Sequence, residues 1–411
     1  MPLSPGEKEE RAFQLGRIFK PATPINRVDL FAGRQSQTQD VLDAINQNGQ
    51  HVVLYGERGV GKTSLANVLF PKLRCPGHEV MTPQINCTSQ DTFSAIWKRV
   101  FEEIQFKEDT TEHLDIPEAV VNLLADYTQQ YADELSPDII RRVLLELGSR
   151  VLLVVIIDEF DTVESDEVRQ TMADTLKFLS DRNVPATVVL IGVADDVEGL
   201  IADHQSTERC IVQVPMPRMS RREIEDVVTT CLTIAKMGID TLALRDISRI
   251  SKGLPHYAHL LGLHAGRAAV EQGSITVTQD HVSRGIRTAI GKAQASIQQH
   301  YRRAISSARK DAQYREVLLA CAMARTDEFG YFSPVNVREP LSRIRKEECK
   351  IEAFARHLHA FSGTDRGPVL RKEEYGKRAR FRFANPLIQP YVLLKGVADG
   401  LISEEDLKEA T

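Results

Sequence analysis

Runs of hydrophobic residues along the chain predict a strand-and-helix part followed by a helical part. Residues 51–55, 151–157 and 185–194 are almost entirely apolar over strand-like lengths, as expected of strands buried on both faces of a parallel sheet. Residues 166–183 have helical spacing, and a further short apolar segment lies at 210–217. Strands that alternate with helices predict a parallel α/β sheet with its ligand chemistry at the carboxyl edge. From residue 218 to 292 the spacing is helical.

A glycine-rich turn follows the first of these strands and leads into an amphipathic helix. The segment "GERGVGKT", residues 56–63, fits the spacing G-x-x-x-x-G-K-[ST], in which glycines let backbone N–H groups approach phosphate oxygens. The N-terminus of the following helix favours the same anion. Lys62 is expected to reach the β- and γ-phosphates, and the Thr63 hydroxyl to ligate Mg²⁺. The predicted nucleotide-binding residues here are Gly56, Gly59, Gly61, Lys62, Thr63 and Ser64.

The second apolar strand ends in two carboxylates, Asp158 and Glu159. An acid at this position can hold the Mg²⁺ together with Thr63, and the next acid can orient or deprotonate a water. We therefore expect Asp158 to serve the metal and Glu159 to act as the general base.

Composition places the chain among ordinary folded proteins. Its 411 residues are 42% hydrophobic and 27% charged, and this length predicts two or three domains. The longest aliphatic run, at 151–157, is far shorter than the roughly 20 residues that span a bilayer. Charges occupy the place where a signal peptide would be apolar, and six scattered cysteines have no metal or disulfide spacing. We expect a cytoplasmic protein with reduced thiols and no membrane partner.

Charge is distributed unevenly along the chain. The net charge is −5, yet residues 296–395 hold 20 Lys and Arg against 11 Asp and Glu. This segment therefore carries +9, and the remainder of the chain carries −14. A basic segment attached to an acidic protein favours a polyanionic partner.

Together these motifs resemble the AAA+ ATPases, specifically the initiator-like clade of origin-recognition and transposition-regulator proteins. The resemblance covers residues 24 to about 395, with 56–63 as Walker A and Asp158–Glu159 as Walker B. Residues 29–45 look like the opening box of the family, whose Phe31, Gly33 and Arg34 would flank the adenine. The resemblance implies ATP and Mg²⁺ as cofactors and self-association through the ATPase core.

Three further positions follow from the resemblance. Asp195 stands where the first sensor usually has Asn, and a carboxylate there would repel the γ-phosphate. His256 replaces the second-sensor arginine and can donate to phosphate in a pH-dependent way, or can be a structural histidine of the lid. Arg209 is similar to the arginine finger that reaches a neighbouring subunit's site, the alternative being a surface arginine paired with Glu208. If Asp195 and His256 occupy the sensor positions, they imply weak basal hydrolysis that needs a partner or assembly. The alternative is that the alignment to the first sensor is off by one residue.

The segment between the two nucleotide motifs begins with an amphipathic helix at 91–106. The family has a helix near here that touches DNA, which would use Trp97 and Lys98, whereas its apolar face favours a buried helix. Residues 107–150 predict two more helices, and the acidic 107–135 gives no sign of a nucleic-acid surface.

The basic segment predicts three helices, at 314–324, 333–344 and 350–363, followed by a β-hairpin at 368–383 that turns at 374–376. This order resembles a winged-helix domain, in which the third helix enters the major groove and the hairpin follows the backbone. Lys350, Arg356, His357 and His359 would then be near DNA. Hairpin cations expected to meet phosphates are Arg371, Lys372, Lys377, Arg378, Arg380 and Arg382. Alternatively, Phe381 and Phe383 pack inward and the arginines merely face solvent, in a domain that docks protein.

The predicted architecture is a P-loop AAA+ α/β core with a parallel sheet, a helical lid and a C-terminal winged-helix domain. Its expected divisions are an arm at 1–25, the core at 26–217, the lid at 218–292, the winged helix at 293–396 and an acidic tail at 397–411. The first functional hypothesis is a slowly hydrolysing ATPase that binds duplex DNA and recruits or regulates a DNA-processing protein in replication, transposition or mobile-element defence. The alternatives are a signal-transducing switch whose winged helix docks protein, and a nucleotide-bound scaffold.

Overall fold

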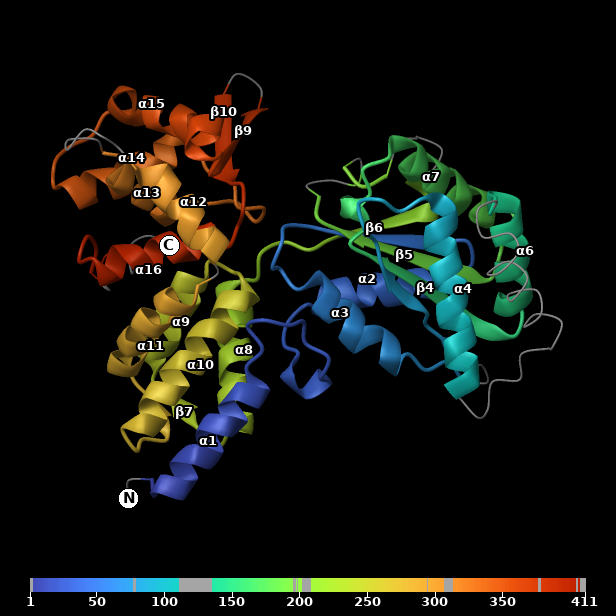
Figure 1. Cartoon of the computed structure of the whole chain (residues 1–411), viewed down its shortest axis with the longest axis horizontal. Coiled ribbons are helices and arrows are strands. Elements are labelled where there is room, and N and C mark those ends of the chain that lie inside the picture. Colours follow the sequence, from blue (N-terminus) through green and yellow to red (C-terminus); the bar gives the residue numbers. More distant parts are fainter. Residues whose placement is uncertain are drawn as a thin grey trace.

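The computed structural model describes residues 3–76, 79–110, 135–194, 197, 199–201, 208–293, 295–306, 313–375, 378–403 and 406. Asp195, Lys377 and nearly all of the acidic stretch 107–135 lie outside these described residues. Among the residues described, no helix is long and apolar enough to cross a membrane. Figure 1 shows the sheet-containing part at one end and the helical and C-terminal parts together at the other.

A parallel sheet forms the first part, which confirms the predicted fold class. Within the described residues it has six strands in the order β2-β4-β5-β1-β6, and β3 also pairs with β4. All of the pairings are parallel. The strands are β1 (His51–Tyr55), β2 (Glu79–Met81), β3 (Gln84–Asn86), β4 (Val151–Asp158), β5 (Ala186–Gly192) and β6 (Ile211–Pro215).

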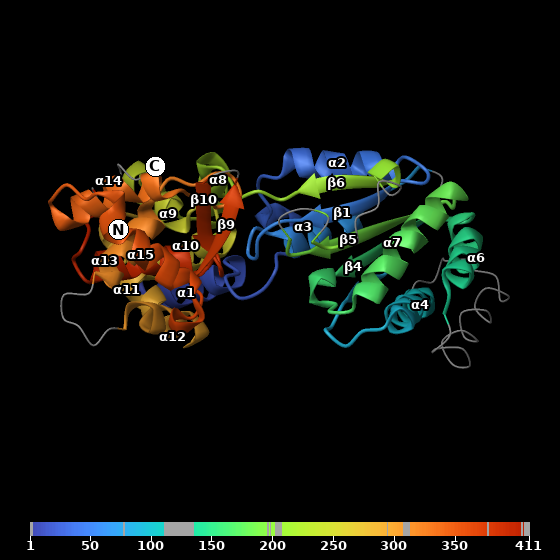
Figure 2. The same cartoon turned by 90° about the horizontal axis from the view of Figure 1, so that it is seen from above.

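Helices cover both faces of this sheet (Figure 2). Alternate residues of β4 belong to different clusters: Val154 and Ile156 pack with α2 and α3, whereas Val155 and Ile157 pack with α4, α6 and α7. This two-residue alternation with apolar side chains on both faces explains the uninterrupted apolar runs in the sequence. The helices are α2 (Gln35–Ile45), α3 (Lys62–Leu69), α4 (Phe93–Thr110), α6 (Pro137–Gly148) and α7 (Asp166–Asp181).

The helix predicted at 91–106 is a buried packing element, α4. Trp97 is fully buried, with its ring near those of Phe93 and Phe101. Trp97 therefore contributes to the core rather than to a nucleic-acid surface. The alternative in which this residue touches DNA is wrong, because no part of its ring is exposed.

A second group of helices follows the sheet. It consists of α8 (Arg221–Ile234), α9 (Thr241–Ser251), α10 (Pro255–Glu271) and α11 (Gln279–Lys292), with the short strands β7 (Gly238–Ile239) and β8 (Thr276–Val277). The N-terminal helix α1 (Pro5–Ile18), which the sequence did not reveal, packs on this group. A Cβ on Gly262 would lie 2.4 Å from the Phe19 ring, and a Cβ on Gly266 would lie 3.1 Å from the Leu15 side chain. The two glycines on α10 therefore let α1 and the residue after it approach closely.

The C-terminal part contains the predicted order of three helices and a hairpin. These are α13 (Tyr314–Met323), α14 (Pro334–Arg345), α15 (Ile351–Ser362) and the antiparallel strands β9 (Leu370–Tyr375) and β10 (Arg378–Phe383). Phe332 bridges to Phe381 of β10, and Phe381 and Phe383 are buried as expected. Two helices flank this unit, α12 (Ala295–Ile305) and α16 (Ile388–Ala398).

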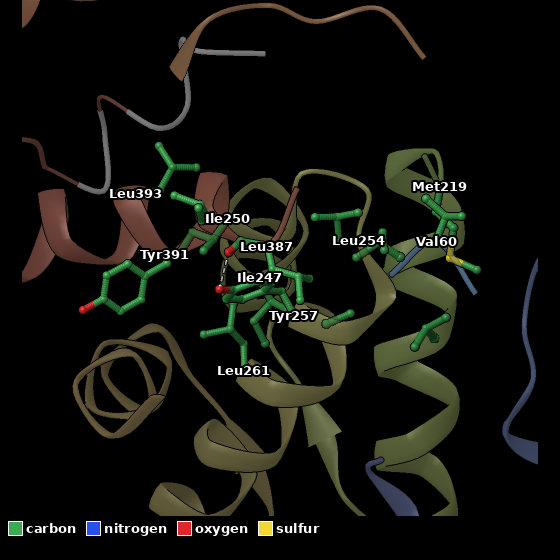
Figure 3. Close-up of a cluster of buried hydrophobic side chains, with 14 of the residues drawn as sticks. Val60, Met219, Ile247, Ile250, Leu254, Tyr257, Leu261, Leu387, Tyr391 and Leu393 are labelled. Atoms are coloured by element: carbon green, nitrogen blue, oxygen red, sulfur yellow. Dashed lines mark hydrogen bonds between the residues drawn. The ribbon is translucent and has the colours of Figure 1, made fainter. Parts of the chain in front are cut away.

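One apolar cluster joins the sheet part, the second helical group and the C-terminal part (Figure 3). It includes Val60 from the glycine-rich loop, Tyr257 from α10, and Leu387 and Tyr391 from the start of α16. The Tyr257 hydroxyl donates to the Leu387 carbonyl oxygen at 2.6 Å. The C-terminal part is therefore packed against the phosphate loop.

Candidate functional site

The loop after β1 turns sharply into α3 around three glycines. Gly56, Gly59 and Gly61 have φ values of +151°, +87° and +98°, which favour glycine. A Cβ at Gly56 would lie 2.4 Å from the Met216 carbonyl oxygen. The loop therefore needs glycine to pass close to the chain that leaves β6, and its backbone stays open to a phosphate.

Lys62 begins α3, and its amine lies inside the loop. Nζ donates to the carbonyl oxygens of Gly56 and Glu57, each at 2.9 Å. Burial lowers the pKa of Lys62 to about 8, although the nearby carboxylates of Asp161 and Asp158 act in the opposite direction. To bind a phosphate, this amine has to exchange loop carbonyls for phosphate oxygens.

The carboxyl end of β4 brings Asp158 to the same edge of the sheet. Its Oδ1 accepts the Glu159 backbone N–H at 2.7 Å, and its Oδ2 has no hydrogen-bond partner among the described residues. Burial raises the pKa of Asp158, opposed by the Thr63 hydroxyl, the Glu159 N–H and the Lys62 ammonium. A buried, unpartnered carboxylate oxygen beside a threonine hydroxyl fits the oxygen-rich ligation that Mg²⁺ prefers.

Glu159 lies just beyond β4 with an exposed side chain and a left-handed backbone, φ +56°. Two residues later, Asp161 accepts the Val193 backbone N–H at 2.8 Å, which ties the end of β4 to the end of β5. Asp161 was not predicted as a site residue. The sequence signal for it is the third acid in "DEFD", which places one more carboxylate near Lys62.

The opening box places Arg34 against the loop, where its guanidinium has a packing role. Nη2 donates to the carbonyl oxygens of Val60 at 2.9 Å and Pro217 at 2.6 Å, and Glu223 accepts the Arg34 backbone N–H at 3.1 Å. Arg34 is buried, and Phe31 is half-buried. Arg34 therefore fastens the phosphate loop to the chain entering α8, and its predicted contact with adenine stays a prediction.

Two further predicted residues lie on the borders of the loop. Ser64 accepts the Ile25 backbone N–H at 3.1 Å, so the segment after α1 crosses the start of α3. Half-buried His256 is the second residue of α10, and burial lowers its pKa. Its neighbour Pro255 would lie 3.9 Å from a Cβ on Gly61. The start of α10 is thus beside the loop, while phosphate sensing by His256 stays a prediction.

A buried polar chain connects the phosphate loop to the C-terminal part. Arg218 Nε donates to Glu57 Oε2 at 3.0 Å, with the side chains 6% and 4% exposed. Through Nη1 the same guanidinium donates to Gln389 Oε1 at 2.5 Å, and Gln389 Nε2 donates to the Ala322 carbonyl oxygen at 3.1 Å. Gln389 is completely buried on α16. Glu57 occupies a variable position of the glycine-rich motif, so the motif gave no reason to single it out.

Two C-terminal residues close over this polar chain. A Cβ at Gly330, which has φ +80°, would lie 2.5 Å from both Arg218 Nη2 and Glu57 Oε1. Leu387 Cδ2 would lie 3.2 Å from a Cβ on Gly59. The loop before α14 and the residue before α16 therefore contact the phosphate loop directly.

Arg209 lies at the amino end of β6, where Gln50, next to the start of β1, donates to its carbonyl oxygen at 3.0 Å. This is the edge of the sheet opposite to the phosphate loop, because β1 and β6 are parallel. Its guanidinium, 69% exposed, pairs with Asp181. The alternative partner, Glu208, has its side chain outside the described residues. Arg209 cannot serve the nucleotide site of its own chain, so any role as an arginine finger has to be played in trans.

Some of the predicted DNA-contacting residues are exposed, whereas others are buried or paired with neighbouring side chains. His357 is buried and its ring packs edge-to-face on Tyr314, so its expected place near DNA is wrong. Arg380 pairs with Glu373, and Arg382 is 7% exposed over the Tyr331 ring. The exposed members are Lys350, Arg356, His359, Arg371 and Lys372, and Arg378 is the first residue of β10.

Comparison with known proteins now places this site in a family. Residues 24–360 match nSTAND1, described as Novel STAND NTPase 1. The chain belongs to the nSTAND1 family. The matched residues contain the phosphate loop, Asp158, Glu159 and Arg218, so this nSTAND1 protein is a STAND-type NTPase. None of the curated proteins matches its sequence.

A search of the solved structures finds proteins similar to this nSTAND1 protein, and the first of them shares its fold. A Walker-type ATPase of Pyrococcus abyssi is 14% identical with a TM-score of 0.55, covering 91% of this chain and 99% of that one. The ORC2 protein of Aeropyrum pernix, in ADPNP–ADP complexes, is 16% identical with a TM-score of 0.49, covering 96% and 97%. The ORC1 protein of Aeropyrum pernix in complex with DNA is 14% identical with a TM-score of 0.43, covering 91% and 95%.

Proposed function

We propose that this protein is an Mg²⁺-dependent ATPase that works as a switch, in which docking of the C-terminal part on the phosphate loop restrains turnover. The observation that carries this proposal is the buried connection from Glu57 through Arg218 to Gln389. A charged pair this deeply buried is strongly destabilised when one partner moves away. A change in the loop therefore acts on the docking of the C-terminal part.

Nucleotide binding supplies such a change. Lys62 donates to the Glu57 carbonyl oxygen, and the Glu57 side chain holds Arg218. When the Lys62 amine binds a phosphate instead, the Glu57 carbonyl oxygen loses this hydrogen bond. Because the side chain of the same residue positions Arg218, a change in the Glu57 backbone also affects Arg218. Occupancy of the phosphate loop and docking of Gln389 are thereby coupled in both directions, as linkage requires.

The catalytic residues have separate roles in this proposal. Thr63 and Asp158 would hold Mg²⁺, which would neutralise charge on the phosphates. Glu159 accepts a proton from the attacking water, and Lys62 stabilises negative charge on the phosphates. Arg209 completes the site of a neighbouring copy. ATP as the nucleotide rests on the resemblance to AAA+ ATPases, and Asp195 and His256 at the sensor positions favour slow basal turnover.

The decisive experiment weakens docking without touching the catalytic residues. Gln389→Met keeps side-chain volume but loses the bonds to Arg218 and Ala322, worth roughly 1–3 kcal/mol. We expect basal ATP turnover and nucleotide exchange to rise by about tenfold. Gln279→Met removes a comparable bond, to Asp246 at 2.6 Å within the helical group, and should change neither rate. Unchanged rates in Gln389→Met, with the fold intact, would exclude the switch.

Duplex DNA binding is the second candidate function, favoured by cations on the C-terminal surface. Lys350 is exposed just before α15, and Arg356 is exposed on α15. Arg371 and Lys372 are exposed on β9, and the Lys372 amine lies 3.7 Å from the Glu374 carboxylate. In this proposal residues 293–396 are a winged-helix domain, with α13, α14 and α15 as its three helices and β9 and β10 as its wing. This surface would contact DNA, a DNA-processing protein or a signalling partner.

DNA binding is tested with a labelled duplex at several salt concentrations. Arg356→Ala and Arg371→Ala should weaken binding uniformly across sequences, each reducing the slope of log affinity against log salt by about 1. Arg287→Ala, an exposed arginine on α11, is the matched control and should leave the slope unchanged. Duplex affinity that does not depend on Arg356 or Arg371 would favour protein docking instead.

A further inference from the structure

A cavity of about 460 Å³ lies between the N-terminal helix and the second helical group, apart from the phosphate loop. It is bordered by α1, α10 and α11, and its volume lies in the range of small-molecule sites. The residues that give it chemical character are Phe13, His264, Arg267, Glu271, Arg284 and Lys292. Neither the predicted nucleotide site nor the C-terminal switch uses any of them.

The cavity has an excess of cationic groups. Arg284 pairs with Asp280 at 2.9 Å, whereas Arg267 and Lys292 form no ion pair or hydrogen bond within the described residues. The Arg267 guanidinium lies against α1, since a Cβ on Gly16 would be 2.9 Å from its Nη2. Two cations and one carboxylate, Glu271, therefore remain to interact with a ligand. Such groups bind phosphate oxygens well.

His264 adds a buried polar group to the same wall. His264 is only 5% exposed, and its side chain makes no hydrogen bond among the described residues. Burial, with Lys292 and Arg267 nearby, lowers the pKa of His264 to about 4, so the ring is neutral at physiological pH. A buried imidazole of this kind is left with hydrogen-bonding capacity, which a ligand in the cavity can satisfy.

Phe13 provides an aromatic surface at the border. Phe13 lies on α1 and is 65% exposed, and the Arg17 guanidinium lies 5.7 Å from the centroid of its ring. An exposed phenylalanine next to unpaired cations matches a molecule that has both a flat ring and an anionic group, because bases stack on aromatic side chains.

We propose that this cavity binds a mononucleotide-like small molecule, with its phosphate on Arg267 and Lys292 and its base on Phe13. This second site is separate from the proposed switch, and evidence against one would not be evidence against the other. Arg267 is twelve residues along α10 from Pro255, or about 18 Å at the helical rise, so the two sites do not overlap. The ligand would also hold α1, whose continuation reaches Ser64 through Ile25.

The test uses the full chain carrying Lys62→Ala, which removes the phosphate-loop amine. Binding of AMP and GMP is measured by calorimetry, alongside ribose 5-phosphate and adenosine as probes that each lack one half. We expect saturable binding of at least one mononucleotide, with each half-probe at least tenfold weaker. A short oligonucleotide that binds while AMP and GMP do not would overturn the proposal in favour of a nucleic-acid surface.

Variants locate the binding. Lys292→Glu, at an exposed position that tolerates substitution, should weaken mononucleotide binding at least tenfold, and Phe13→Ala should remove the preference for AMP over ribose 5-phosphate. Arg287→Glu makes the same change of charge on α11 away from the cavity and should have no effect. Equal effects of Lys292→Glu and Arg287→Glu, or no binding of AMP and GMP, would overturn the site.

Discussion

Arg218 and Glu57 form an ion pair of 3.0 Å between the first residues beyond β6 and the phosphate loop, with both side chains almost completely buried. Their separation in sequence, more than 150 residues, means that the pair exists only in the folded protein. Its removal is therefore a direct test of how strongly the loop depends on its neighbours.

Removing one partner should cost much more than removing both charges. Arg218→Gln removes the ion-pair partner of the buried Glu57 carboxylate, and we expect a loss of roughly 3–5 kcal/mol in the free energy of unfolding. The double variant Glu57→Gln with Arg218→Gln should lose clearly less. Urea unfolding measures both, with Arg150→Gln as a control in an exposed pair that should cost at most about 1 kcal/mol. Single and double variants of equal stability would contradict this account.

The docked loop before α14 gives an independent way to disturb the same contact. Gly330→Ala places a methyl group 2.5 Å from Arg218 and Glu57, so we expect the C-terminal part to loosen and ATP turnover to rise. Gly400→Ala has a comparable backbone cost, at φ +68°, but meets nothing within 4 Å. Steady-state turnover should rise severalfold in Gly330→Ala only. A rise in both would mean that backbone strain, and not the contact, controls the rate.

The fold and the site differ in how much of them the sequence predicts. The strands at 51–55 and 151–158 and the loop between β1 and α3 were predicted closely, because buried apolar runs and a phosphate motif are local signals. Helix α1 was not, since its apolar contacts are few and its sequence is highly charged. Local sequence patterns therefore predict elements in which most residues are buried, and miss a helix that buries only a few.

Long-range polar contacts leave no such pattern. Nothing near Gln389 indicates that it meets Arg218, because α16 is mostly apolar and a single glutamine near its start has no periodic meaning. The alternation "RARFRF" predicted inward phenylalanines correctly, yet Arg382 is buried too, held over Tyr331. Partners of charged residues follow from tertiary packing alone, which is why the exposed cations were overestimated.

Nucleotide affinity should depend on pH through Lys62. In the nucleotide-free protein the pKa of its amine is about 8, below the ordinary 10.5, and phosphate oxygens would raise it. Binding then takes up a proton at high pH: this contribution leaves affinity constant well below pH 8 and lowers it above pH 8, by at most about tenfold per pH unit. Equilibrium binding of a fluorescent ATP analogue between pH 6.5 and about 9.5 would show this. In Lys62→Arg, which does not titrate, this dependence should disappear.

Glu159 should separate turnover from binding. Glu159→Gln keeps the shape of an exposed side chain but cannot accept the proton of water, so we expect ATP turnover to fall by about 10²–10⁴-fold with little change in nucleotide affinity. Lys62→Ala, by contrast, should lose affinity. Measuring turnover and binding in both variants also tests the scaffold alternative, under which Glu159→Gln would be harmless. Glu102→Gln, at an exposed glutamate of α4, is the matched control and should change neither quantity.

Arg209 should act only on a neighbouring copy. It lies at the edge of the sheet opposite to its own phosphate loop, so a finger role requires two chains. Arg209→Ala and Glu159→Gln should each be nearly inactive alone, whereas their mixture should regain activity. In mixed assemblies an intact Glu159 from one variant meets an intact Arg209 from the other. Arg182→Ala, on the same exposed surface, should be active alone. A mixture no more active than its components would identify Arg209 as a surface residue whose partner is simply Asp181.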